Sequence, residues 1–187
     1  MVALTPAQRL TAVLVTDEAL AAELTTSGTD LERAYDGERA PGFPAGTVTA
    51  CGTRAVSSTK DAKQVRAHVR AWVVNGVVLT QEVHVLPRQR AEDVVAKAAS
   101  TLKGCASYAD HGDGYRRTAS NKIKLPEPVR GAAACFTVAG SVNCHAYLGR
   151  AGVVTTVSSM GPDQKTAEWW LDRIMTAAEH RLEKLPA

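Results

Sequence analysis

Three short antiparallel strands are predicted between Ala134 and Ser158, and a pair of cysteines fixes the register of the first two. If Ala139-Gly140 forms a two-residue hairpin loop, counting outward from it places Cys135 directly opposite Cys144. This pair falls on a non-hydrogen-bonded position of the ladder, where side chains approach each other most closely. The register therefore predicts a cross-strand disulfide between the two cysteines.

The same count divides the side chains of this meander between two faces, with Arg150-Ala151 taken as the second turn. The face predicted to be core carries Cys135, Thr137, Val142, Cys144, Ala146, Leu148, Val153 and Val157. The other face carries Phe136, Asn143, His145, Tyr147, Thr156 and Ser158. This second face is amphiphilic, which is typical either of a solvated surface or of the wall of a ligand-binding cleft.

A further hairpin is predicted over Ala67–Leu86, because Asn75-Gly76 is flanked by β-branched residues and favours a type I′ turn. Its pairing places Arg70, Trp72 and Gln81 on one sheet face. An apolar platform with a guanidinium and an amide beside it suits a polar, ring-containing or carboxylated ligand. The alternative interpretation is structural: a helix covers part of this face and Arg70 extends to solvent.

Helices are predicted at both ends and in the middle of the chain, from their caps and apolar spacing. Their expected starts or ranges are Thr5-Pro6, Thr16, Ala91–Lys103 and Asp163–Leu185. The segment Thr25–Gly46 is predicted to be ordered but irregular. Since tight turns join neighbouring strands, we expect residues 1–187 to form one α+β domain, an antiparallel sheet of hairpins and a meander with helices on one face.

The composition restricts the partners and the location of the protein. A net charge of +3, with no block of Lys or Arg, argues against nucleic acid. No apolar run approaches the roughly 20 residues that cross a bilayer, and the first residues lack the features of a signal peptide. Either the protein is cytoplasmic, or Met1 follows a removed signal peptide, lipid anchor or membrane segment. The second case fits four cysteines without C-x-x-C spacing, since disulfides persist in exported proteins.

The sequence carries no signature of catalysis, a metal or a cofactor, so catalytic residues stay unknown and neither metal nor cofactor is predicted. Ser141 follows Gly140 in a hairpin turn instead of a nucleophile elbow. The string Asp110-His111-Gly112-Asp113 is explained by turn chemistry as well as by metal binding. Two acid or base candidates remain, His84 beside Glu82 and His145 beside Tyr147, although strand histidines are more often structural.

The chain resembles the extracellular sensor-domain family of PknH-type receptor kinases, and the actinobacterial lipoproteins that share this domain. The resemblance spans nearly the whole chain. It rests on Cys51–Val56, the hairpin with Trp72, the helix that runs into Cys105, the strand pair Cys144–Val157 and the closing helix. It implies an antiparallel sheet flanked by helices, a small-ligand cleft, and two disulfides, with Cys51 bonded to Cys105. The second bridge departs from the family, which has a cysteine near Ser158–Gly161 where this chain has none.

Three functions are consistent with these features. The first is a non-enzymatic, extracytoplasmic sensor-type module that binds an unidentified small molecule through Arg70, Trp72, Gln81, His145 and Tyr147. Such a module would act with a signalling partner and would touch a membrane only through a removed anchor or that partner. The second is the same fold recruited as an enzyme without a motif, a cyclase or isomerase of actinobacterial secondary metabolism that acts by orienting its substrate. The third is an interaction module, which predicts a flat apolar patch.

Overall fold

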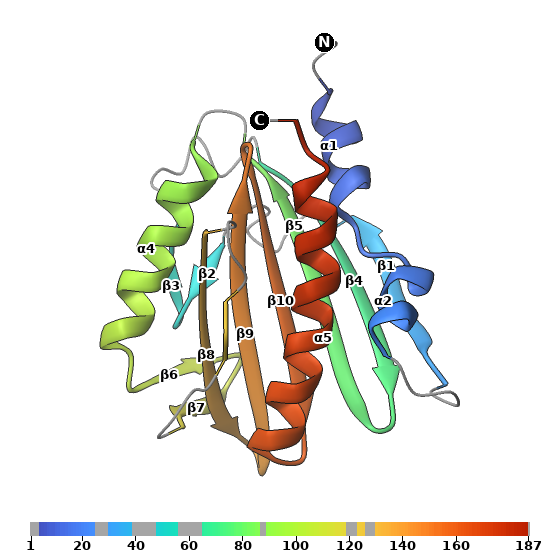
Figure 1. Cartoon of the computed structure of the whole chain (residues 1–187). Coiled ribbons are helices and arrows are strands. Elements are labelled where there is room, and N and C mark those ends of the chain that lie inside the picture. The colour runs from blue at the N-terminus through green and yellow to red at the C-terminus, as the bar shows by residue number, and fades with distance from the viewer. Residues whose placement is uncertain are drawn as a thin grey trace.

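The computed structural model describes residues 4–24, 30–38, 48–55, 65–86, 89–118, 123–125 and 130–186. Within these residues an eight-stranded sheet forms the centre of the molecule, in the order β1-β4-β5-β10-β9-β8-β7-β6, and every pairing in it is antiparallel (Figure 1). The strands are β1 (Glu32–Glu38), β4 (Arg66–Val74), β5 (Val77–Val85), β6 (Ser107–Asp110), β7 (Asp113–Arg117), β8 (Arg130–Val138), β9 (Ser141–Arg150) and β10 (Val153–Gly161). A separate hairpin consists of β2 (Thr49–Ala50) and β3 (Thr53–Arg54).

The predicted helices are present, and their caps explain where they begin. They are α1 (Pro6–Val13), α2 (Asp17–Glu23), α4 (Ala91–Gly104) and α5 (Gln164–Glu183). The side chains of Thr5, Thr16 and Asp163 each accept a hydrogen bond from a backbone N–H of the first helical turn. These bonds satisfy donors that a helix start leaves without partners, so the sequence signals for the helix starts were reliable.

The two predicted hairpin registers are confirmed. Cys135 lies opposite Cys144 and Arg70 lies opposite Gln81. The second turn of the meander is wrong by one residue, because its loop is Ala151-Gly152 instead of Arg150-Ala151. Both loop residues have positive φ, 51° and 75°, and a glycine at the second position adopts this conformation without strain.

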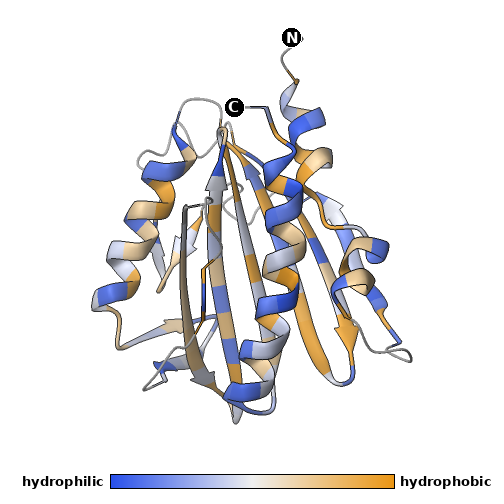
Figure 2. Ribbon diagram, in the orientation of Figure 1, coloured by the Kyte–Doolittle hydropathy of each residue, from blue (hydrophilic) through white to orange (hydrophobic). Residues whose placement is uncertain are grey.

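Helices cover both faces of the sheet, so the prediction that all helices lie on one face is wrong for α4. One face carries α1, α2 and α5 and a core that includes Trp72, Leu79 and Leu148. The opposite face carries α4 and the β2–β3 hairpin, with a second core around Phe136 and Tyr147. Successive side chains of a strand point to opposite faces of the sheet, so the large side chains on the face away from α5 must be buried by other elements. In Figure 2 hydrophobic and hydrophilic residues alternate along the strands behind α5, and hydrophilic residues occupy much of the outer side of this helix.

A close backbone contact sets α4 on the sheet. A Cβ atom added at Gly149 in β9 would lie 2.8 Å from Cγ2 of Val95 and 3.0 Å from the carbonyl oxygen of Ala91. Glycine is therefore the residue that lets the helix approach the strand this closely. Ala91, Val94, Val95, Ala98 and Leu102 of α4 are buried by this packing.

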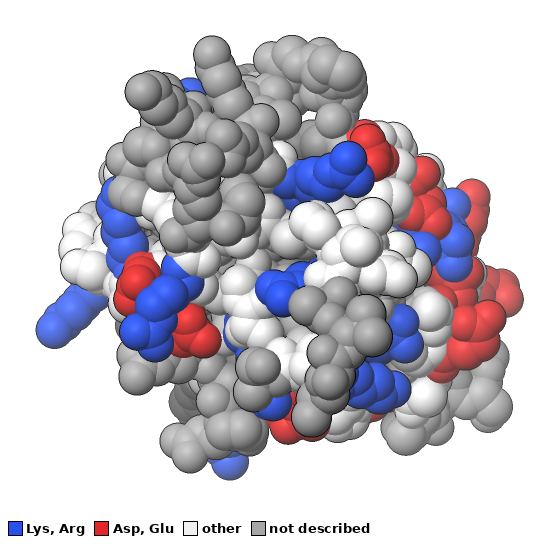
Figure 3. All heavy atoms as spheres, turned by 90° about the horizontal axis from the view of Figure 1, so that it is seen from above, with Lys and Arg blue, Asp and Glu red and all other residues white. Residues whose placement is uncertain are grey.

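The edge strand β1 was not predicted. It lies in the segment Thr25–Gly46, which the sequence analysis interpreted as irregular; residues 25–29 and 39–46 of that segment are outside the described residues. Most side chains of β1 are exposed, so the strand shows no apolar alternation. Charged side chains are typical of an edge, where they oppose pairing with other chains. Viewed from above, Asp and Glu side chains gather on the side where α2 and β1 lie (Figure 3).

Candidate ligand-binding cavity

A cavity of about 250 Å³ lies on the face of the sheet that α4 and the β2–β3 hairpin cover. Its floor is formed by alternate side chains of three adjacent strands: Thr80, Glu82 and His84 of β5, Thr156 and Ser158 of β10, and His145 and Tyr147 of β9. Val48, Thr49, Cys51 and Gly52 of the β2–β3 hairpin form its roof, and Tyr108 and Asp110 of β6 lie at one side. The cavity is therefore built mainly of polar groups on a rigid sheet.

The sheet register brings the floor residues together in two rows. Ser158 pairs with His145 on one side and with Thr80 on the other. Thr156 pairs in the same way with Tyr147 and Glu82. Each row crosses three strands, which lie about 4.8 Å apart, so a ligand of modest size reaches side chains from all of them.

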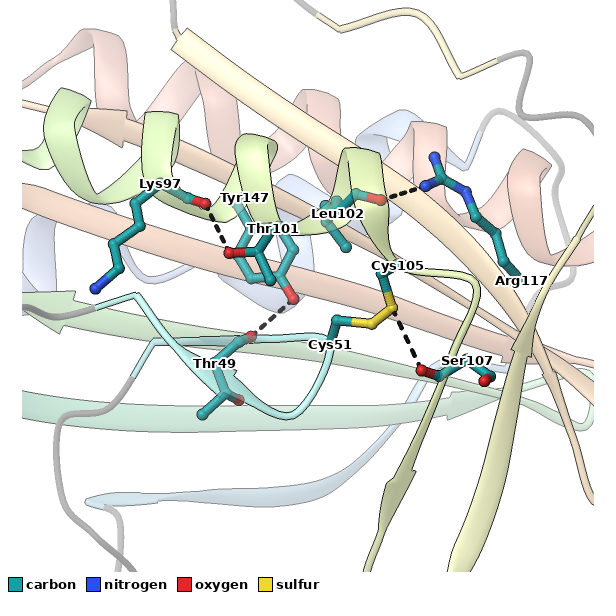
Figure 4. The surroundings of a disulfide bond; sticks show 9 residues. All are labelled: Thr49, Cys51, Lys97, Thr101, Leu102, Cys105, Ser107, Arg117 and Tyr147. Carbon is teal, nitrogen blue, oxygen red and sulfur yellow. Dashed lines mark hydrogen bonds between the residues drawn. A yellow bond between two sulfur atoms is a disulfide. The ribbon is translucent and has the colours of Figure 1, made fainter.

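Tyr147 connects the floor to the roof. Its hydroxyl donates a 2.8 Å hydrogen bond to the carbonyl oxygen of Thr49 (Figure 4). Burial raises the pKa of the Tyr147 phenol, with smaller contributions from Tyr108 and Glu82, so the hydroxyl keeps its proton. Tyr147 consequently acts as a neutral hydrogen-bond donor that positions the hairpin.

A disulfide between Cys51 and Cys105 attaches the roof to the end of α4 (Figure 4). Their Cα atoms are 6.3 Å apart, and the two cysteines are 54 positions apart in the sequence. The guanidinium of Arg117 donates a hydrogen bond to the carbonyl oxygen of Leu102, which satisfies an acceptor in the last turn of α4. The second disulfide, Cys135–Cys144, is buried on the other face, in the core under α5.

His145 is a floor residue with a buried polar atom that makes no hydrogen bond to the described residues. Its Nε2 atom is buried and has no hydrogen-bond partner among the residues that the structure describes. Burial lowers the pKa of His145 from the ordinary 6.5 to about 4, although the charge of Asp110 acts in the opposite direction. The ring packs edge-on to Phe136, with 6.4 Å between the ring centroids. At neutral pH His145 is therefore an uncharged imidazole beside the cavity.

Two carboxylates contribute negative charge to the cavity. The Glu82 side chain is 19% exposed, and its Oε1 atom lies 3.5 Å from Nε2 of His84. The Asp110 side chain, at the rim, is 57% exposed and lies 3.7 Å from Nε2 of His111. Tyr108, which also lines the cavity, stacks on Tyr115 with the ring centroids 4.5 Å apart.

The structure separates the predicted ligand residues into two groups. His145 and Tyr147 line the cavity, whereas Arg70, Trp72 and Gln81 lie on the opposite face of the sheet, beneath α1 and α2. The polar atoms of these three are engaged by the chain itself, as Nη1 of Arg70 donates to the carbonyl oxygen of Val15, 2.7 Å away. Nε1 of Trp72 donates to Oδ1 of Asp17 at 2.7 Å, and Oε1 of Gln81 accepts from the backbone N–H of Val15 at 2.8 Å. They hold the connection between α1 and α2 against the sheet, so we leave them out of the candidate site.

Several cavity residues were missed by the sequence analysis as ligand candidates. Thr156 and Ser158 were assigned to the same face as His145, and His84 beside Glu82 was considered only as an acid or base candidate. The sequence gives no signal that β10 pairs with β5, and this pairing alone unites the two sets. The roof residues and Tyr108 reach the cavity through contacts between distant segments, for which no local pattern exists.

Neither a metal site nor a membrane span is found in the part of the chain that the structure describes. No group of three or more His, Cys, Asp or Glu side chains there is arranged to hold a metal ion. None of the described helices combines the length and apolar character needed to cross a membrane.

Comparison with solved structures shows the fold. The chain is similar to the extracellular domain of PknH from Mycobacterium tuberculosis, with a TM-score of 0.53 and 16% sequence identity over 96% of this chain and 98% of that one. It is also similar to a putative uncharacterized protein from Mycobacterium smegmatis, with a TM-score of 0.42 and 10% identity over 91% of this chain and 98% of that one. No protein-family model matches the sequence, and no curated protein matches it significantly. The first likeness confirms the α+β fold that the resemblance implied.

Proposed function

Because this chain shares the fold of the PknH extracellular domain, we propose that it is a sensor-type module that binds a small molecule in the cavity beneath the β2–β3 hairpin. The observation that carries the proposal is the polar cavity with the buried Nε2 atom of His145 beside it. A buried polar atom without a hydrogen bond costs about 1–3 kcal/mol. A ligand that forms a hydrogen bond with this atom would remove that cost, and the gain in free energy would favour binding.

The proposed site consists of His145 and Tyr147 on β9, with Glu82, Thr80 and Ser158 from the neighbouring strands. Sites of this kind place a few polar groups at fixed positions and take their rigidity from the surrounding scaffold. Here the scaffold is the centre of the sheet, packed on its other face by α5. Binding would therefore change the roof and the ligand more than the sheet.

We further propose that the protein acts outside the cytoplasm and that ligand binding changes its interaction with a signalling partner. Two disulfides support the location, because such bonds rarely persist in a reducing cytosol. The similar structure from Mycobacterium tuberculosis is an extracellular domain, which supports the same location.

A screen of the oxidised protein against metabolites and cell-envelope compounds tests the proposal. A ligand of the cavity should shift amide NMR signals of β5, β9 and β10, and at a concentration 100-fold above its Kd it should stabilise the protein by about 2.7 kcal/mol. The Ser158→Phe variant places a ring in the cavity and should abolish both effects. Ser107→Phe, at an exposed serine of β6 that does not line the cavity, is the matched control and should leave them unchanged.

Two results would count against the proposal. One is a folded Ser158→Phe variant that binds as well as the parent protein. The other is a set of ligands whose NMR shifts fall on the opposite face, around Arg70 and Trp72.

A further inference from the structure

We infer that the ligand of this cavity is a single neutral ring with several hydroxyl groups, a monosaccharide or a cyclic polyol, and this inference rests on the proposed function. Three hydroxyl side chains, those of Thr80, Thr156 and Ser158, lie together on the floor. Ser158 is directly opposite Thr80, and Thr156 is two residues along the same strand, so all three share one face. A ligand in the cavity therefore meets a cluster of hydroxyl groups on a rigid sheet.

The hydrogen-bonding capacity of the lining matches ligand hydroxyls. Each Thr or Ser hydroxyl both donates and accepts, whereas the carboxylates of Glu82 and Asp110 only accept. Glu82 also contacts His84, but a carboxylate has about four lone-pair sites and accepts several hydrogen bonds at once. Such a lining requires a ligand that donates as well as accepts. A phosphate or carboxylate only accepts, and the described lining has neither the Lys nor the Arg that usually holds it.

His145 adds a group that a hydroxyl satisfies in either tautomer. Its buried Nε2 atom makes no hydrogen bond to the described residues, and burial keeps the imidazole uncharged at neutral pH. In a neutral imidazole this nitrogen is a donor in one tautomer and an acceptor in the other. A ligand hydroxyl pairs with both forms. An ammonium group pairs only with the acceptor form, and a carbonyl group pairs only with the donor form.

The roof and one side of the cavity supply apolar surface opposite the polar floor. Val48 and the disulfide-bonded Cys51 belong to the roof, and Tyr108 lies at the side. The Tyr108 ring is held in place by stacking on Tyr115 and by an edge-on contact with Phe136, whose ring centroid is 5.1 Å away. A sugar ring has hydroxyl groups around its edge and C–H groups on its faces. It would therefore combine hydrogen bonds to the floor with apolar contacts to the roof and side.

The volume of the cavity limits the ligand to one ring. A dry protein cavity of about 150 Å³ takes up one benzene molecule. The cavity here measures about 250 Å³, which leaves room for a six-membered ring with substituents. It is smaller than the roughly 300–1,000 Å³ of sites for drug-sized molecules. A second sugar unit would have to lie outside the rim.

Four neutral compounds test the ligand class: glucose, galactose, mannose and myo-inositol. Each is titrated up to about 100 mM into the oxidised, isotope-labelled full chain, which reveals binding with a Kd in the millimolar range. At least one should shift the amide NMR signals of Thr80, His145 and Thr156. Cyclohexanol and cyclohexylammonium, six-membered rings with one polar group, should bind at least about tenfold more weakly than the best of the four, because they lose several hydrogen bonds. Glucuronate, the anionic sugar, should give no shift at these residues.

Methyl glycosides of glucose, galactose and mannose distinguish a free monosaccharide from the terminal unit of a glycan. Methylation blocks the anomeric hydroxyl, which is the position that joins a sugar to a glycan. Equal affinity of a sugar and its methyl glycoside would indicate a glycan end as the source. Loss of binding on methylation would indicate the free monosaccharide.

Variants assign the preference to the hydroxyl groups of the floor. Thr80→Val and Thr156→Val keep the branched shape of the side chain but remove the hydroxyl, so each should weaken binding of the best compound by about three- to tenfold. Thr53→Val is the matched control, because Thr53 is an exposed residue of β3 that does not line the cavity. It should leave the affinity unchanged. NMR signals that stay in place away from the cavity show that the variants are folded.

The outcomes separate this inference from the proposed function. The inference is overturned if none of the four compounds shifts the cavity signals, or if cyclohexanol, cyclohexylammonium or glucuronate binds as tightly as the best of them. Shifts confined to the opposite face, around Arg70 and Trp72, would overturn it as well. The metabolite screen with Ser158→Phe tests the cavity independently. A ligand without hydroxyl groups that binds there would support the proposed function alone.

Discussion

Gln81 and Glu82 are adjacent in β5, yet strand alternation directs them to opposite faces of the sheet and to different roles. Gln81 is fully buried, and its Nε2 atom donates 3.1 Å hydrogen bonds to the carbonyl oxygen of Val13 and to Oγ1 of Thr155. Glu82 reaches the cavity. The hairpin register predicts that the two side chains lie on opposite faces. It does not predict which face becomes packed core and which lines the cavity, because the positions of α1 and α4 depend on contacts between distant segments.

The pH dependence of stability provides a residue-scale prediction for His145. Its pKa is about 4 in the folded protein and about 6.5 when unfolded, so the unfolded chain binds a proton that the folded chain excludes between these values. The contribution of the uncharged His145 ring to the free energy of unfolding is therefore complete above about pH 6.5. It is lost as the pH falls towards about 4. Denaturant unfolding at a series of pH values should show this loss, with an upper limit of about 3 kcal/mol. The His145→Asn variant should not show it.

The control for this measurement is His111→Asn, at an exposed histidine of the β6–β7 turn, and it should keep the pH dependence of the parent protein. Asp17, Asp36 and Asp163 do not interfere, because their pKa values lie below the ordinary 3.8 and their contributions are lost at lower pH. Equal slopes for His145→Asn and the parent between about pH 6.5 and 4 would contradict the assignment.

At the scale of elements, the two disulfides have different tasks. Cys51–Cys105 closes a loop of 54 residues and Cys135–Cys144 one of 9, so the chain-entropy model gives them about 4 and about 2.5 kcal/mol. Replacing both cysteines of the first pair by alanine should free the β2–β3 hairpin. The measurement is hydrogen exchange of the Ala55 amide, which donates a 2.7 Å bond to the carbonyl oxygen of Val48.

The second disulfide supplies the control for that experiment. The variant with Cys135 and Cys144 replaced by alanine should lose stability but keep the protection of the Ala55 amide relative to the rest of the protein, because this pair lies on the opposite face. Ligand binding should weaken in the first variant and persist in the second. A hairpin that stays protected without Cys51–Cys105 would show that the hydrogen bond from Tyr147 is sufficient to hold the roof.

The sequence predicted those elements whose signals are local. Asn75-Gly76 and Ala139-Gly140 mark two turns, and Thr5, Thr16 and Asp163 mark three helix starts. It failed for β1, whose exposed, charged residues pair with β4 without any apolar alternation. The sequence analysis also failed to place α4. The helix packs on small residues of β8 and β9, such as Gly149, and a small residue in a strand does not by itself indicate that a helix covers it.

At the scale of the whole molecule, the two faces of the sheet differ in what they hold. The face under α1, α2 and α5 holds most of the largest buried side chains, whereas the face under α4 and the hairpin holds the cavity. The extracytoplasmic location proposed for the protein predicts its thiol state. Alkylation and mass spectrometry of protein taken from its native host, without reductant, should detect no reactive thiol. Four labelled thiols would contradict this location and would favour the alternative of an intracellular cyclase or isomerase, which remains a prediction.

The roof of the cavity is a short hairpin, Val48–Ala55, that belongs to neither the large sheet nor a helix. Substitutions in its loop can therefore reshape the chamber without disturbing the ladder of β5, β10 and β9 beneath it.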